Sequence, residues 1–223
     1  MDSMFPPPEA ADENGFLAIS RNLNTRMLLD AYYHGIFPWP AWERDVIWAA
    51  PHKRGILPMD RVHIPKSLAR IVKQGKFTVR IDTCFGEVID ACASVPRDDE
   101  GTWITRKLRR VYRDFHDEGW AHSFETFNND GKLVGGLYGV LLGKVFCGES
   151  MFHYEDNASK VAFCKMVDVL RANGVELIDT QMVTPVTASF GAYEVPAAEY
   201  YQLLKRLRSD QPRKKLEVPT ASE

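Results

Sequence analysis

Apolar positions along the chain recur with two spacings, one typical of helices and one typical of strands. The helical spacing, read with capping residues, predicts helices at 24–34, 65–75, 84–94, 105–118 and 158–173, and a last helix opened by Pro196. Alternation predicts strands at 77–82, 121–127, 132–140, 145–150 and 175–181. The aromatic, proline-rich stretch 35–42 and the polar stretch 96–103 are expected to be loops.

The order of these elements indicates the fold class and the domain boundaries. Three antiparallel strands, a helix and a further strand favour an α/β (α+β) fold with a mixed, largely antiparallel sheet. We expect a small N-terminal domain at 1–96, basic toward its end, and a larger domain at 97–208. The polar segment 209–223 is expected to be a disordered tail.

Charge is unevenly distributed, although the net charge of the 223 residues is only -2. In two segments, 53–80 and 105–113, the charged residues are all basic except Asp60. Such segments are typical of phosphate-binding faces, and equally of ordinary solvated helix faces. The candidate phosphate contacts are Lys53, Arg54, Arg61, Lys66, Arg70, Lys73, Arg106, Lys107, Arg109 and Arg110.

Several classes of protein and site are disfavoured. The first ten residues lack the basic and apolar regions of a signal peptide, and no apolar stretch approaches a membrane span. The four cysteines and six histidines show no metal-ligand spacing, and no phosphate-binding glycine motif occurs. We therefore expect a cytoplasmic protein with no membrane association, no metal and no organic cofactor.

Polar chemistry concentrates at the ends of two apolar strands. Asp179 and Gln181 are two residues apart, so a strand places both side chains on one face. Glu149 lies in an apolar, glycine-rich stretch, 135–152, whose glycines suggest bulges or close approach of a ligand. The alternatives are a structural ion pair at Glu149 and polar residues that merely close a core strand.

Eight short stretches in this chain are similar to one known family. They are AYYHGIFPW (31–39), GTWIT (101–105), AHSFE (121–125), LVGGLYGV (133–140), GESMF (148–152), ASK (158–160), IDTQ (178–181) and SFGA (189–192). In this order they resemble the leucyl/phenylalanyl-tRNA–protein transferases. The resemblance covers residues 22 to 207.

The resemblance implies an enzyme that takes Leu or Phe, with Met as a further candidate donor, from its aminoacyl-tRNA. The acceptor would be the α-amino group of a protein with N-terminal Arg or Lys, which is thereby marked for degradation in the N-end rule pathway. The implied fold is a small N-terminal domain and a larger N-acetyltransferase-like domain. No cofactor is implied.

The resemblance also assigns residues to roles. Gln181 would accept a hydrogen bond from the attacking amine, Asp179 would polarise or orient Gln181, and Glu149 would orient substrate groups. Whether this pair moves a proton, or only aims the amine while ribose hydroxyls carry the proton, stays open. The substrate contacts implied are Trp48 and Trp103 on the terminal adenosine, Ser189, and an apolar donor pocket of Leu137, Phe146, Met151, Phe163 and Ile178.

This chain departs from the family pattern at a few positions. WAAPHKR (48–54) stands where the family has Trp-Trp-Ser-Pro-Asp-Pro-Arg, so Ala49 replaces an aromatic residue, and Val186 stands near a usual His. Two other functions compete with the transferase. One is a non-catalytic RNA- or peptide-binding module on the same fold, and the other is an acetyl-CoA-dependent acyltransferase, disfavoured because no loop for that cofactor's pyrophosphate is present.

Overall fold

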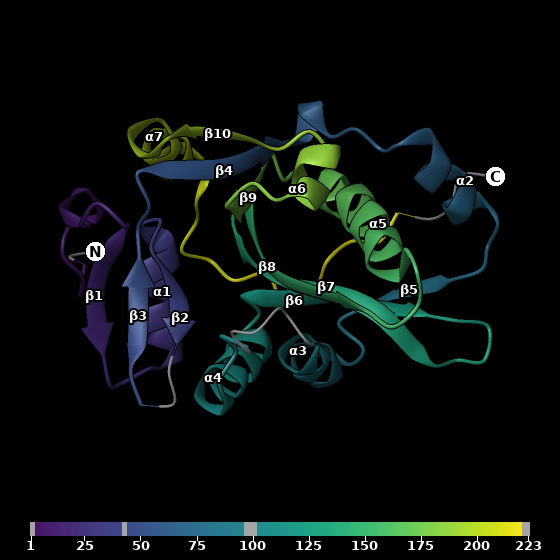
Figure 1. Cartoon of the computed structure of the whole chain (residues 1–223), viewed down its shortest axis with the longest axis horizontal. Helices are drawn as coiled ribbons and strands as arrows, with labels where there is room; N and C mark the ends of the chain where they lie inside the picture. Colours follow the sequence, from purple (N-terminus) through teal and green to yellow (C-terminus); the bar gives the residue numbers. More distant parts are fainter. Residues whose placement is uncertain (1–2, 42–43, 96–101, 220–223) are drawn as a thin grey trace.

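A computed structural model describes residues 3–41, 44–95 and 102–219, and it contains two sheets (Figure 1). The smaller sheet has the strand order β1-β3-β2, with all neighbours antiparallel. Its strands are β1 (Phe16–Ser20), β2 (Phe37–Ala41) and β3 (Val46–Ala49), and α1 (Thr25–Tyr33) lies beside it. A short 3₁₀ helix, Pro8–Ala10, precedes β1.

The predicted loop at 35–42 is wrong over most of its length, because β2 lies within it. Pro38 and Pro40 disfavour a strand since neither has an N–H to donate. The topology removes this objection, because β2 is at an edge of its sheet and pairs only with β3. Position 42 lies outside the described residues.

The larger sheet has seven strands in the order β10-β4-β9-β8-β7-β6-β5. All neighbours are antiparallel except β8 and β9, which are parallel. The strands are β4 (Lys53–Pro58), β5 (Thr78–Ile81), β6 (Ala121–Phe127), β7 (Leu133–Leu142), β8 (Val145–His153), β9 (Leu177–Gln181) and β10 (Tyr193–Pro196). The predicted mixed, largely antiparallel fold is therefore confirmed.

Helices cover both faces of the larger sheet (Figure 1). On one face lie α3 (Phe85–Ser94) and α4 (Arg106–Asp117), and on the other lie α5 (Ala158–Ala172) and α2 (Lys66–Lys73). Two short helices, Met59–Arg61 and α6 (Pro185–Ser189), and the terminal α7 (Ala197–Leu207) complete the chain. Each face has its own apolar cluster, one shared with the N-terminal sheet and one built around α5. The predicted long helices are confirmed, while α6 was not predicted.

The sheets divide the chain earlier than the predicted boundary at residue 96. Both β4 and β5 precede that boundary, yet both belong to the seven-stranded sheet, where β4 lies between β10 and β9. Sequence patterning misses β4 because a buried charge, Arg54, interrupts its apolar run. We propose that the small N-terminal unit ends near residue 50.

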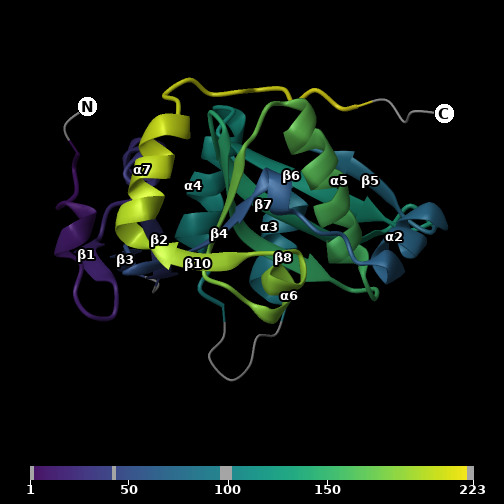
Figure 2. The same ribbon diagram turned by 90° about the horizontal axis from the view of Figure 1, so that it is seen from above.

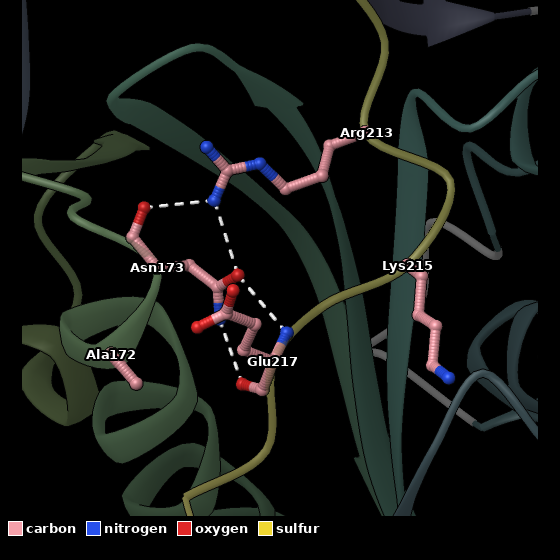
Figure 3. A pocket seen from close by; sticks show the side chains of 5 residues that line it. All are labelled: Ala172, Asn173, Arg213, Lys215 and Glu217. Carbon is pink, nitrogen blue, oxygen red and sulfur yellow. Dashed lines mark hydrogen bonds between the residues drawn. The ribbon is translucent and has the colours of Figure 1, made fainter.

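The predicted disordered tail is wrong for residues 209–219, which dock onto the body (Figure 3). Leu216 is buried in the cluster around α5. Arg213 donates from Nη1 to the backbone oxygen (2.8 Å) and Oδ1 (3.1 Å) of Asn173, and the N–H of Glu217 donates to the same Oδ1 at 3.0 Å. These contacts border a polar cavity of about 350 Å³. Figure 2 shows the tail on the opposite side of the molecule from α6. Residues 220–223 lie outside the described part.

Candidate functional site

The candidate site begins where β8 and β9 stop pairing. Their parallel ladder joins Val145 to Leu177, Phe146 to Ile178 and Cys147 to Asp179, and it ends there. Beyond that point β9 continues along β4, with Gln181 opposite Gly55. Glu149 on β8 and Gln181 on β9 therefore lie just past the last shared pair, where two adjacent strands leave side chains free to meet.

A β-bulge directs the side chain of Glu149. Ser150 pairs with Tyr138 and Gly148 pairs with Gly139, so Glu149 is the extra residue of β8. A bulge changes the direction of side chains along a strand. It needs Gly139, because a Cβ there would lie 2.3 Å from the backbone oxygen of Cys147. The expectation of bulges from the glycine-rich sequence is confirmed here.

The carboxylate of Glu149 connects two sets of groups. Its Oε1 accepts a hydrogen bond from Nε2 of Gln181 at 2.9 Å, and its Oε2 accepts one from the hydroxyl of Tyr112 at 3.1 Å. The Tyr112 hydroxyl lies 2.5 Å from that of Tyr32. Burial raises the pKa of Glu149 to about 7, and the hydroxyls of Tyr32 and Tyr112 offset this only in part. Glu149 therefore titrates in the range useful to a general base at neutral pH.

Gln181 has an unusual backbone for its residue type. Its φ is 54°, in the left-handed region, and its N–H donates to Oδ1 of Asp179 at 2.9 Å. Strained backbone of this kind is concentrated at functional sites. While Nε2 is bound by Glu149, the amide oxygen Oε1 accepts no hydrogen bond from the described residues. It is available to accept a hydrogen bond from a substrate.

Asp179 is fully buried and is occupied by protein donors. Arg54 donates to both of its oxygens, from Nε at 2.8 Å and from Nη2 at 2.6 Å, and the Tyr200 hydroxyl donates at 2.7 Å. Such a two-point pair is strong and directional. Asp179 thus holds the backbone of Gln181 and does not contact its side-chain amide, which is bound by Glu149.

The prediction that Arg54 contacts tRNA phosphates is wrong. The side chain is buried between the rings of Phe37 and Tyr200, with the guanidinium carbon 4.5 Å from each ring centroid. Burial alone would lower the pKa of Arg54, but the negative charge of Asp179 outweighs it and raises the pKa above its usual value. The physical reason for the error is that a charged residue in a basic segment is expected in solvent, whereas this one neutralises a buried carboxylate.

The residues predicted for an apolar donor pocket lie in one cluster on the α5 face of the sheet. Four of the five come from the adjacent strands β7, β8 and β9, and Phe163 comes from α5. The members are Leu137, Phe146, Phe163 and Ile178, all at most 3% exposed, with Met151 partly buried against them.

The remaining predicted substrate contacts, Trp48, Trp103 and Ser189, lie in three different environments. The prediction that Trp48 stacks on the terminal adenosine is wrong, because its side chain is fully buried and donates from Nε1 to the Ser20 hydroxyl at 2.8 Å. Trp103 is partly buried against the cluster on the α3 and α4 side. Ser189 is exposed on α6, where its hydroxyl donates to the backbone oxygen of Val186 at 2.6 Å.

An apolar hollow of about 290 Å³ lies beside the site, between the N-terminal sheet and the residue after Gln181. Its exposed large apolar side chains are Phe16, Trp39 and Met182, at 39%, 40% and 45%. The hollow is lined by Asn14, Gly15, Phe16, Phe37, Trp39, Ile47, Ala49, Pro51 and Met182. The residue that replaces an aromatic in the family pattern, Ala49, therefore borders this hollow.

The basic residues are mostly free to meet a ligand. Arg109 is an exception, because its Nη1 lies 3.0 Å from Oδ1 of Asp90 and so ties α4 to α3. Lys107 donates to the backbone oxygen of Arg21. Lys53 is exposed but its Nζ lies 3.5 Å from Oε2 of Glu194, and Arg61 is exposed but lies over the ring of Tyr193. The remaining exposed cations are Lys66, Arg70, Lys73, Arg106 and Arg110.

Three tyrosines of the site were not predicted from the sequence. Tyr32 and Tyr112 lie on helices among apolar residues, a pattern that indicates core aromatics. Tyr200 follows the same pattern on α7. The hydroxyls of Tyr112 and Tyr200 join the candidate site only because the fold directs them at Glu149 and Asp179.

Within the described residues, no three His, Cys, Asp or Glu side chains are placed to hold a metal ion, and the four cysteines are free thiols. None of the helices in the described ranges is long and apolar enough to cross a membrane.

Comparison with known proteins gives consistent matches over most of the chain. A family model described as leucyl/phenylalanyl-tRNA protein transferase matches residues 56–205. A protein of that name from Pseudoalteromonas atlantica is 47% identical over 90% of this chain and 86% of its own length. One from Pseudomonas putida is 46% identical over 93% of this chain and 92% of its own length.

Among solved structures, FemX aligns with a TM-score of 0.46 and 11% identity, over 80% of this chain and 70% of its own. A tandem GNAT protein from the clavulanic acid biosynthesis pathway aligns with a TM-score of 0.37 and 13% identity, over 75% of this chain and 57% of its own.

Proposed function

Because the chain belongs to the leucyl/phenylalanyl-tRNA–protein transferase family, we propose that it transfers Leu or Phe from aminoacyl-tRNA to proteins with N-terminal Arg or Lys. The observation that carries the mechanism is the hydrogen bond from Gln181 to Glu149 at the parting of β8 and β9. The acceptor class, the donor Met and the fate of the product in the N-end rule pathway rest on the family resemblance.

The reaction forms one bond and breaks one. The acceptor α-amine attacks the carbonyl carbon of the aminoacyl ester, the peptide bond forms, and the ester bond to the ribose oxygen breaks. The proton lost by the amine ends on that ribose oxygen. Since the ester is already activated, the protein contributes mainly by orienting the amine and assisting proton transfer.

Gln181 and Glu149 divide these tasks. The Oε1 of Gln181 accepts a hydrogen bond from the amine, and Glu149 fixes the amide so that Oε1 points outward. Glu149, with its pKa raised by burial to about 7, accepts the amine proton directly or through water and returns it to the leaving oxygen. Asp179 is a positioning residue, because it acts through the Gln181 backbone.

The aminoacyl-tRNA donor contacts the protein on both sides of Gln181 and Glu149. Its side chain enters the apolar cluster of Leu137, Phe146, Met151, Phe163 and Ile178. Its terminal adenosine lies in the hollow beside Met182, where Trp39 offers an exposed ring in place of the buried Trp48. Exposed cations of α2, α4 and their flanks contact the tRNA phosphates, which makes binding dependent on salt.

A transfer assay tests the proposal. The protein is incubated with radiolabelled Leu-tRNA or Phe-tRNA and a protein with N-terminal Arg, and label in protein is counted. We expect transfer by the wild type, and at least about tenfold less by Gln181→Ala and by Glu149→Ala. Gln211→Ala, in the exposed tail, is the matched control and should transfer normally. Absence of transfer by folded wild-type protein with either donor refutes the proposal.

A further inference from the structure

The segment 182–189 connects two residues that are firmly held. Gln181, before it, is buried and its N–H is bound by Asp179. Phe190, after it, is 1% exposed, and its ring stacks on Phe163 with 4.0 Å between centroids. The backbone oxygen of Phe190 also accepts a hydrogen bond from the N–H of His63 at 2.9 Å.

Between these anchors the segment is bonded only to itself and its immediate neighbours. None of its residues is buried. In the described parts of the chain, every hydrogen bond of residues 182–189 has its partner between residues 180 and 192. Thr184 and Thr187 form a capping box that gives the segment one compact helical turn, α6. The segment is therefore a preformed unit without a hydrogen-bonded attachment to the body.

Two valines make its apolar contact with the cluster around α5, whereas Met182 faces the hollow beside the N-terminal sheet. Val183 and Val186 are half-buried and, like Met151, pack against the buried cluster that contains Phe163 and Ile178. The other side of the segment is open to solvent, and there Ala188 is exposed. Val186 and Ala188 thus lie on the same short helix but differ in what they face.

The inner residues of the cluster that these valines pack against are closed to solvent, and Met151 at its edge is partly buried. Phe146, Phe163 and Ile178 are at most 3% exposed. A donor side chain therefore reaches them only if part of the surface moves, and the parts of the sheet around them are tied by ladder hydrogen bonds. Displacement of segment 182–189 would break apolar contacts but no hydrogen bond to the body.

We propose that residues 182–189 form a lid over the donor side-chain pocket, and that Val183 and Val186 are the wall of the lid that the donor side chain meets. The size of these two residues then sets how well Phe is accepted relative to Leu. This inference rests on the proposed function, since it concerns the donor of that reaction.

Substitutions on the two sides of α6 test the wall. The measurement is kcat/KM for Phe-tRNA and for Leu-tRNA with the same acceptor. In Val186→Phe the ratio of Phe to Leu should fall roughly tenfold, because the added ring occupies space that the larger donor needs. In Ala188→Phe, the matched control, the ratio should stay at the wild-type value. Equal ratios in the two variants, or a change only in Ala188→Phe, overturn the inference.

A smaller residue provides a variant that does not overpack. Val183→Ala/Val186→Ala should raise the ratio of Phe to Leu several-fold, by the reverse of the same argument. An unchanged ratio in this variant contradicts the proposal that Val183 and Val186 contact the donor side chain. The failure of the proposed function is separate, because then the wild type itself transfers neither Leu nor Phe.

Hydrogen exchange tests the lid directly. The amides of 182–189 should exchange faster than those of β9, and an amide-linked analogue of phenylalanyl-adenosine should slow them at least threefold. Protection equal to that of β9 without the analogue, or no change on adding it, overturns the lid.

Discussion

The side-chain N–H of Gln181 donates to Oε1 of Glu149 at 2.9 Å, across the gap that opens where β8 and β9 stop pairing. This bond decides which end of the Gln181 amide faces outward. An ionised carboxylate only accepts hydrogen bonds, so Nε2 must point to Glu149 and Oε1 away from it. A protonated Glu149 can donate instead, which permits the reversed amide.

Transfer should therefore depend on the ionisation of Glu149. Its pKa is raised to about 7, so the active, ionised form is lost as the pH falls through 7. The acceptor amine, with a pKa of about 8, also loses its reactive form as pH falls. We expect kcat/KM for transfer to fall below pH 7, and a plot of log(kcat/KM) against pH to have a slope greater than one there.

Glu149→Gln separates the two groups. The amide oxygen that this substitution introduces still accepts a hydrogen bond from Gln181, but the amide does not titrate. Only the amine dependence should therefore remain, with a slope of one and a lower maximal rate. The measurement is the pH profile of kcat/KM from about pH 5.5 to 9, a range that spans both pKa values. A profile of the same steepness in wild type and variant contradicts the role given to Glu149.

The same carboxylate should cost stability. Its folded pKa is about 7 against an ordinary value of 4.5, so the folded state holds its proton more tightly than the unfolded state. The penalty is complete above pH 7 and disappears as the pH falls below 4.5. Glu149→Gln should therefore raise the free energy of unfolding by about 1–3 kcal/mol at about pH 8. Urea unfolding at that pH and at about pH 4.5 measures this, and an equal gain at both values contradicts it.

Arg54 should matter for folding and not for tRNA affinity. Its removal leaves Asp179 as a buried charge without its partner, which costs about 3–5 kcal/mol. Arg70, exposed on α2, is the comparison. Arg70→Ala should change stability by less than about 0.5 kcal/mol but lower the slope of log affinity against log salt by about one.

Urea unfolding and tRNA binding at several salt concentrations distinguish the two residues. For Arg54→Ala the salt slope is measured on the folded fraction at low temperature and should equal that of the wild type. A reduced slope with normal stability in Arg54→Ala would reinstate a direct phosphate contact.

Two glycines near Gln181 make a matched steric test. A Cβ on Gly55 would lie 2.7 Å from the carbonyl carbon of Met182, so alanine there displaces the chain that carries Gln181. A Cβ on Gly148 meets nothing closer than 3.8 Å. Gly55→Ala should lower the free energy of unfolding by about 1–3 kcal/mol. Its effect on transfer should be mainly a lower kcat, with a smaller change in KM. Gly148→Ala should keep wild-type stability in thermal unfolding, and equal costs would contradict the packing described.

Much of the fold follows from sequence periodicity. The helices at 105–118 and 158–173 are predicted because apolar residues recur at helical spacing, and the strands at 121–127 and 145–150 because short apolar runs are bounded by turn signals. The period fails at β4, where a buried Arg54 replaces an apolar residue, and at β2, whose prolines are tolerated at a sheet edge. It fails again in the tail, where one buried leucine and a few hydrogen bonds hold an otherwise polar segment.

The amino-acid sequence alone was enough to predict the family and the mixed α/β class, and it singled out Glu149, Asp179 and Gln181 as the polar groups of the candidate site. Their hydrogen-bond partners could be identified only in the folded chain, because those partners lie far away in the sequence. Arg54 meets Asp179 across the contact of β4 with β9, and Tyr112 meets Glu149 across the contact of α4 with the sheet. The pKa of Glu149 comes from burial among these groups, and burial is a property of the packed sheet that no local pattern contains.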